Sequence, residues 1–188
     1  MFNFSINSSE GLVVKPIELD QLTGITEKDV LAVFINSESI KFEELLSVTF
    51  APLIFASPTT TFRFTTDEPI DTTGLYHLTR RIGTARVMEL MLLQQDISSQ
   101  QALSLGLVND TLTLQEFKQK MADIDNLSFT AIRLAIDVAE RASRLSKEQA
   151  ETIEKYAFAL RFSHPDQREG MSAFINKRTP VFHKSSTP

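Results

Sequence analysis

The sequence predicts an α/β protein of 188 residues, with a strand-rich first part and an all-helical second part. The apolar run VLAVFIN, from Val30 to Asn36, has the length of a strand and does not alternate, which is typical of a strand covered on both faces. After Gly83 the apolar residues recur at helical spacing instead. We therefore divide the chain into a core at residues 1–83 and a helical region at 84–188, within one structural domain.

The first part contains a short helix and further strands. Lys41–Val48 has helical spacing, with three apolar residues on one side. The Thr-rich segment at residues 59–66 alternates phenylalanine with polar residues, which favours a strand at the edge of a sheet. The other strand candidates are Leu12–Val14 and Pro52–Ala56.

In the second part, capping residues mark where helices begin and end. Two capping boxes of the pattern Ser-x-x-Gln start at Ser98 and Ser146. Gly106 suits a helix end, and Pro165 suits a first helical turn. The predicted helices cover residues 84–93, 98–105, 114–122, 128–144, 146–162 and 165–176. The residues expected to face inward from the fourth and sixth of these helices are Ile132, Ala135, Ile136, Ala139, Ala173 and Phe174.

Composition excludes several classes of function. The chain has no cysteine, which rules out disulfides, thiolate metal sites and cysteine nucleophiles. A net charge of −5 without a basic stripe argues against nucleic-acid binding. The apolar runs are too short to span a bilayer, and the N-terminus does not resemble a secretory signal. We therefore expect a cytoplasmic protein that binds neither membranes nor nucleic acids.

Few groups suggest chemistry from the residues alone. The three histidines lie far apart and lack the spacing of metal ligands, so no metal site is predicted. Two carboxylate pairs, Glu43-Glu44 and Asp67-Glu68, are candidates for acid/base work, although such pairs are usually solvated. Residues 168–184 hold four basic side chains against Glu169 alone. That stretch suits a phosphate or an acidic partner, or it is a solvated helix face.

Three segments resemble the crotonase superfamily, the enoyl-CoA hydratase/isomerase proteins. They are LTRRIGTARVMELMLL, DISSQQALSLGLVNDTL and FALRFSHPDQREGMSAFINKRTPVF, at residues 78–93, 96–112 and 158–182. The resemblance implies the crotonase-like (ClpP/crotonase) fold, a β-spiral core followed by a C-terminal helical trimerisation region. It implies that the core at residues 1–83 is a shortened spiral.

The resemblance also implies a ligand and an assembly. The ligand is an acyl thioester, carried either by CoA or by the pantetheine arm of a carrier protein, and no other cofactor is implied. Phe158, Lys177 and Arg178 fall where the family contacts the adenine or the phosphates of CoA. A trimer or hexamer is expected, of identical chains or mixed with a full-length crotonase homologue.

The departures from the family concern catalysis. Family members stabilise a thioester enolate with two backbone N–H groups and move protons with one or two glutamates. The segment carrying the first N–H has no counterpart before Val30, and Phe42-Glu43-Glu44 stands near the Gly-Gly turn of the second. One glutamate position falls near Leu46.

The second glutamate position falls near Thr66, in a loop a few residues shorter than the family's. A small slip would place Asp67 or Glu68 there. Three functions therefore stay open: a catalytically degenerate protein that binds a thioester or assembles with a homologue, an active divergent hydratase, isomerase or decarboxylase using Glu68 or Asp67, and a structural scaffold without a small ligand.

Overall fold

The computed structural model describes residues 4–8, 30–65, 74–124 and 126–182. Its residues up to Met121 form one compact unit, and those from Ala122 onward form a second. We call these the core unit and the helical unit. The change from strands to helices lies inside the core unit, since the first long helix begins at Leu75.

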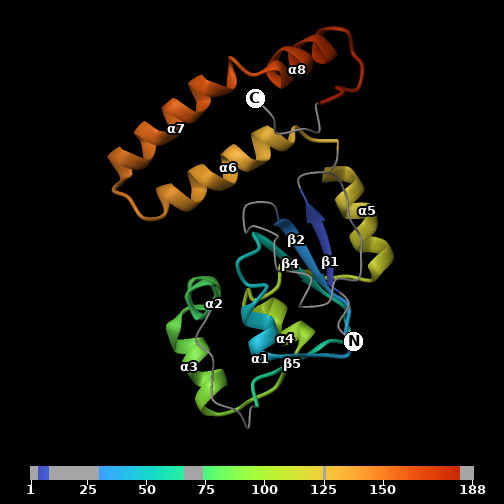
Figure 1. Cartoon of the computed structure of the whole chain (residues 1–188), viewed down its shortest axis with the longest axis vertical. Coiled ribbons are helices and arrows are strands. Elements are labelled where there is room, and N and C mark those ends of the chain that lie inside the picture. Colours follow the sequence, from blue (N-terminus) through green and yellow to red (C-terminus); the bar gives the residue numbers. More distant parts are fainter. Residues whose placement is uncertain (1–3, 9–29, 66–73, 125, 183–188) are drawn as a thin grey trace. The chain divides into compact units, whose positions relative to one another are not determined.

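The core unit contains a four-stranded sheet with the order β1-β2-β4-β7 (Figure 1). Strands β2, β4 and β7 are parallel, and β1 pairs with β2 in the antiparallel direction. All six residues of β2 are buried, which confirms the prediction from the unbroken apolar run. The strands are β1 (Phe4–Ser8), β2 (Val30–Ile35), β4 (Leu53–Ala56) and β7 (Asp110–Thr111).

A second sheet has three strands, β3 (Ser39–Lys41), β5 (Thr61–Arg63) and β6 (Ile97–Ser98), in the order β3-β5-β6. The Thr-rich segment was predicted to lie at a sheet edge, and this is wrong, because β5 is the middle strand. Its Phe62 and the following Phe64 are buried, so the alternation identified the inward residues correctly. The predicted strand Leu12–Val14 lies outside the described residues.

Helices of the core unit pack on these sheets and bury apolar side chains on both faces of β2, since Val33 and Ile35 belong to one apolar cluster and Phe34 packs outside it. Phe117 of α5 stacks on Phe34 of β2 at 4.9 Å between ring centroids and lies 5.6 Å from the ring of Phe55 in β4. The capping box at Ser98 is present, since the Ser98 hydroxyl accepts the amide of Gln101. The helices are α1 (Phe42–Leu46), α2 (Leu75–Ile82), α3 (Thr84–Leu92), α4 (Ser99–Ser104) and α5 (Leu114–Ile124).

The helical unit consists of α6 (Phe129–Ala142), α7 (Lys147–Arg161) and α8 (Pro165–Ile175). Figure 1 shows α6 and α7 running in opposite directions on either side of a turn. Ser146 caps α7 and Pro165 begins α8, as predicted. Neither α6 nor α7 contains a buried residue, so the expected inward face of α6 is wrong. In α8, Ala173 is buried as predicted, but Phe174 is 81% exposed.

Candidate functional site

The candidate proton-transfer residues Thr66, Asp67 and Glu68 lie outside the described residues. The structure does describe the strand that leads to them. Asp96 holds its end, because Oδ1 of Asp96 accepts the backbone N–H of Phe64 at 3.0 Å and the Thr65 hydroxyl at 3.2 Å. Oδ2 of the same carboxylate lies 3.6 Å from Nε of Arg63. One carboxylate therefore fixes the direction in which the chain leaves β5.

Beyond residues 66–73, the chain re-enters the described structure at Gly74, which has a left-handed backbone with φ of +87°. A Cβ atom there would lie 2.5 Å from the carbonyl oxygen of Leu46 in α1. Only glycine fits both the backbone angle and this close approach. The start of α2 is therefore packed directly against the end of α1.

The carboxylate pair at the start of α1 is not uniformly solvated. Oε2 of Glu44 accepts the backbone N–H of Lys41 at 2.8 Å and so caps the helix. Oε1 of Glu43 is buried and has no hydrogen-bond partner within the part of the chain that the structure describes. A buried carboxylate oxygen without a donor is costly, because it loses its hydration. The solvated interpretation of this pair is thus wrong for Glu43.

Arg81, which the sequence analysis did not single out, joins α2 to the segments that precede β4 and β7. Its guanidinium donates to the carbonyls of Ala51 at 2.5 Å and Pro52 at 3.3 Å, and to Oδ1 of Asn109 at 3.3 Å. Burial lowers the pKa of Arg81 by penalising its charged form. In the sequence, Arg81 is an ordinary basic residue, because its carbonyl partners come close to it only in the folded chain.

Phe158 lies on α7, in the helical unit. Its ring is 64% exposed and meets the ring of Phe162 edge-on at 5.0 Å. An exposed aromatic ring can stack on a planar base, and the neighbouring ring limits its rotation. The geometry is therefore compatible with the adenine contact that the family resemblance implies.

Lys177 and Arg178 follow α8 and differ sharply in their surroundings. Arg178 donates through both arms of its guanidinium to Glu169, at 2.5 and 2.8 Å. These hydrogen bonds raise the pKa of Arg178. Lys177 is exposed, and no described residue forms a hydrogen bond or ion pair with its side chain. Of the two basic residues predicted to contact phosphate, Arg178 is thus paired with a carboxylate, whereas the Lys177 ammonium is available to a ligand.

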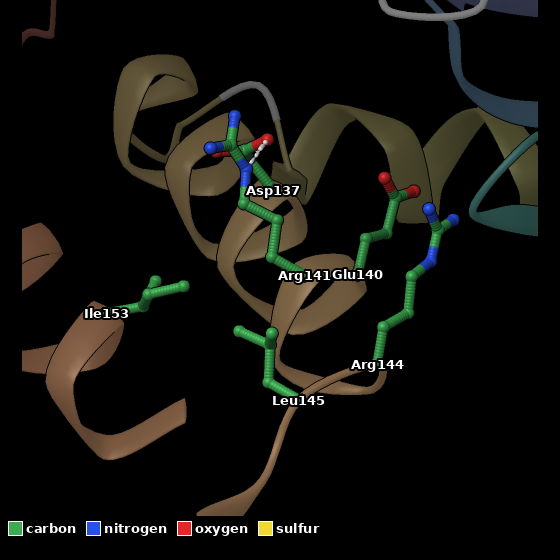
Figure 2. A pocket seen from close by; sticks show the side chains of 6 residues that line it. All are labelled: Asp137, Glu140, Arg141, Arg144, Leu145 and Ile153. Carbon is green, nitrogen blue, oxygen red and sulfur yellow. Dashed lines mark hydrogen bonds and ion pairs between the residues drawn. The ribbon is translucent and has the colours of Figure 1, made fainter. Parts of the chain in front are cut away.

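A pocket of about 460 Å³ lies between α6 and α7. Figure 2 shows its lining, in which Nε of Arg141 donates to Oδ1 of Asp137 at 2.9 Å. Glu140 and Arg144 add one charge of each sign, and Leu145 and Ile153 form the apolar part. None of the predicted site residues that the structure describes lines this pocket. Its balanced charges select neither an anion nor a cation.

Comparison with known proteins identifies the family. The family model for enoyl-CoA hydratase/isomerase matches residues 68–185, more than half of the chain. The chain therefore belongs to the enoyl-CoA hydratase/isomerase family, and its fold is that of the crotonase superfamily. The match begins at Glu68, so it leaves out Thr66 and Asp67, and it includes all described residues of the helical unit.

Among curated relatives, a probable mitochondrial enoyl-CoA hydratase of Dictyostelium discoideum is 32% identical over 114 residues, which cover 58% of this chain and 41% of the relative. The methylmalonyl-CoA decarboxylase of Escherichia coli is 30% identical over 151 residues, covering 75% and 56%. The chain thus spans about half the length of the curated relatives it matches.

Among solved structures, an enoyl-CoA hydratase/isomerase from Marinobacter aquaeolei superposes with a TM-score of 0.73 at 21% identity, covering 86% of this chain and 64% of that one. This likeness confirms the predicted fold. None of the helices within the described ranges is both long and apolar enough to cross a membrane. The same ranges contain no group of three histidine or carboxylate side chains suited to a metal ion.

Proposed function

We propose that this protein binds an acyl thioester and has lost most of the hydratase chemistry of its family, so that it acts as a binding or assembly subunit. The observation that carries the proposal is the Oε1 atom of Glu43 at the start of α1, which is buried and has no hydrogen-bond partner among the described residues. Phe42-Glu43-Glu44 stands near the Gly-Gly turn whose backbone N–H stabilises an enolate in the family. A carboxylate at this place opposes negative charge on a thioester oxygen.

The size of the rate loss at the enolate-binding position decides whether catalysis is efficient or only residual. Losing one oxyanion donor typically lowers a rate by about 10²–10³. A carboxylate with one buried oxygen, as in Glu43, adds repulsion to that loss, because charges interact more strongly away from water. Binding of the thioester depends on other groups, among them Phe158 and Lys177, and is therefore retained.

An active enzyme is the second candidate, and one observation favours it. The similarity to the methylmalonyl-CoA decarboxylase extends over 75% of this chain, well upstream of the helical unit. In this case Glu68 or Asp67 would transfer the proton in a hydration, isomerisation or decarboxylation. A Glu68→Gln, Asp67→Asn double variant would then lose turnover.

We further propose that the helical unit assembles copies of this chain into a trimer or hexamer, or joins it to a full-length homologue. Support comes from the large apolar side chains exposed on α7 and α8, since monomeric proteins rarely expose such groups together. The side chains are Tyr156, Phe158, Leu160, Phe162, Met171, Phe174 and Ile175. The carrier of the thioester, CoA or a carrier-protein pantetheine, is the other open choice.

Thermal unfolding with and without CoA and crotonyl-CoA, followed by hydration absorbance on the same sample, tests the proposal. We expect both ligands to raise the melting temperature, because a ligand that binds only the folded state stabilises it. We expect crotonyl-CoA to be hydrated at least 10³-fold more slowly than by an active family member. Rapid hydration would establish the active enzyme instead. No response to either ligand would favour the scaffold.

A further inference from the structure

The segment after α8 folds back along the helix and is fastened to one residue. Glu169, in the second turn of α8, accepts both arms of the Arg178 guanidinium and also the backbone N–H of Val181, at 2.7 Å. Arg178 donates in addition to the Ser172 hydroxyl at 3.3 Å. The ring of Phe182 lies beside Gly170, 3.8 Å from where a Cβ would stand. We call the contacts of Glu169 with Arg178 and Val181 the clasp.

Lys177 stands at the turn that begins this returning segment. The amide of Lys177 donates to the carbonyl of Phe174 at 3.2 Å, and the amide of Arg178 donates to that of Ala173 at 3.0 Å. These two bonds define a Schellman motif, in which the residue after the C-cap usually is glycine. Lys177 occupies that position with φ of +50°. A strained backbone held in place by its surroundings is frequent at functional sites.

The other end of α8 is fastened as well. Asp166, which is 5% exposed, accepts the hydroxyl of Ser128 at 2.5 Å, and Ser128 is the N-cap of α6. The backbone N–H of Asp166 donates to Nδ1 of His164 at 3.2 Å. Both ends of the helix that carries Lys177 are therefore tied to neighbouring residues by short polar contacts.

We propose that Glu169 and Arg178 are positioning residues, which hold the Lys177 ammonium as the contact for a phosphate of the bound thioester, and that Arg178 itself does not touch the ligand. This inference rests on the proposed thioester binding. It reassigns Arg178, because a guanidinium whose two arms are bound to a carboxylate presents little charge to a second anion. A lysine ammonium contacts phosphate as a point charge and needs only correct placement.

The sign of one substitution separates positioning from direct contact. Glu169→Gln releases Arg178 and loosens the turn at Lys177. If Arg178 only positions Lys177, the affinity for CoA falls; if Arg178 contacts phosphate directly, removing its competitor Glu169 raises that affinity. Arg178→Gln is compared with Arg168→Gln, which removes the same charge from an exposed position of α8 outside the clasp.

The measurement is the dissociation constant of the full chain for two pairs of probes, CoA with dephospho-CoA and phosphopantetheine with pantetheine. The two probes of each pair differ by one phosphate. The ratio of their affinities therefore reports whether the protein contacts that phosphate, and the pair that responds identifies which phosphate it is. We expect Lys177→Gly to reduce the ratio of one pair about tenfold, the loss of one charge-assisted hydrogen bond, without lowering the melting temperature. We expect Glu169→Gln and Arg178→Gln to reduce the same ratio, and Arg168→Gln to leave it unchanged.

Glu169→Gln could instead lower the affinities for all four probes equally and leave both affinity ratios unchanged. That result would show that the clasp is purely structural and would overturn the inference. A wild-type chain that binds none of the four probes would overturn the proposed function, and the ligand role of Lys177 with it. Amide hydrogen exchange then tests the clasp itself without a ligand. Exchange at Arg178 and Val181 should quicken in Glu169→Gln, and unchanged exchange would show that the clasp does not hold the segment.

Discussion

The core unit and the helical unit are stabilised in different ways, although side-chain caps begin helices in both, at Ser98 in the core unit and at Ser128 and Ser146 in the helical unit. In the core unit, every residue of β2 is buried, and so are the inward residues of α1, α3 and α5. In the helical unit, α6 and α7 bury no residue, and specific polar contacts, the clasp and the Ser128–Asp166 bond, fix α8. The core unit therefore folds on its own apolar contacts, whereas the helical unit depends on polar fastenings and on what covers its apolar side chains.

The largest expected effect is that of removing one ring from the core unit. Phe117→Ala should lower the free energy of unfolding by about 3–5 kcal/mol, because the side chain is fully buried and stacked on Phe34. Phe174→Ala, in the helical unit, removes an equal ring that is 81% exposed and should change this quantity by less than about 0.5 kcal/mol. Urea unfolding at low protein concentration measures both. Equal losses would contradict the contrast between the units.

The next effect concerns the junction of α1 and α2. Gly74→Ala should cost about 2–4 kcal/mol, since it combines a left-handed backbone with a Cβ only 2.5 Å from the Leu46 carbonyl oxygen. Gly106→Ala is the matched control, because φ is +77° there and no described atom lies within 4 Å of the added Cβ. That control should cost only about 1 kcal/mol. Similar costs for the two variants would mean that the collision at Leu46 is relieved by a small shift.

Local signals in the sequence predicted the elements of both units well. Ser98, Ser146 and Pro165 mark helix starts by chemistry confined to one turn, and the structure confirms all three. The unbroken apolar run of β2 identified a doubly covered strand for the same reason, since burial on both faces leaves no polar positions.

The errors arose where the outcome depends on distant residues. Whether β5 lies at an edge is decided by its pairing with β6, whose residues are more than thirty positions away. Helical spacing places Phe174 on one face of α8, but it does not tell what covers that face. Likewise, the carbonyl contacts of Arg81 and the burial of Glu43 Oε1 without a partner among the described residues arise only once the chain has folded. The candidate residues Thr66, Asp67 and Glu68 stay sequence predictions.

Removing the N-cap hydroxyls compares the two units at the level of one helix. Ser98→Ala should lower the free energy of unfolding by about 1 kcal/mol, because α4 is part of the packed core. Ser146→Ala removes the same bond from α7, which has no buried residue, and should mainly quicken amide exchange in its first turn. Hydrogen exchange at Gln101 and Gln149 measures the local effects. If Ser146→Ala lowered the global free energy of unfolding as much as Ser98→Ala does, both units would unfold together.

The smallest effect is expected from an exposed ion pair that ties α5 to β7 in the core unit. Nζ of Lys120 lies 2.8 Å from Oδ2 of Asp110 and 5.4 Å from the centre of the Phe55 ring.

The hydrogen bond from Lys120 lowers the pKa of Asp110 below its ordinary value, so the unfolded chain binds a proton more readily than the folded one. The stabilisation is therefore complete above the unfolded carboxyl value of about 3.9 and is lost as the pH falls through the lower folded pKa. Because both side chains are partly exposed to water, which screens the pair, a double-mutant cycle of Asp110→Asn and Lys120→Met should give a coupling of only about 0.2–1 kcal/mol at pH 7. That coupling should weaken in high salt and vanish in acid. A coupling that persists in acid would show that it does not depend on the charge of Asp110.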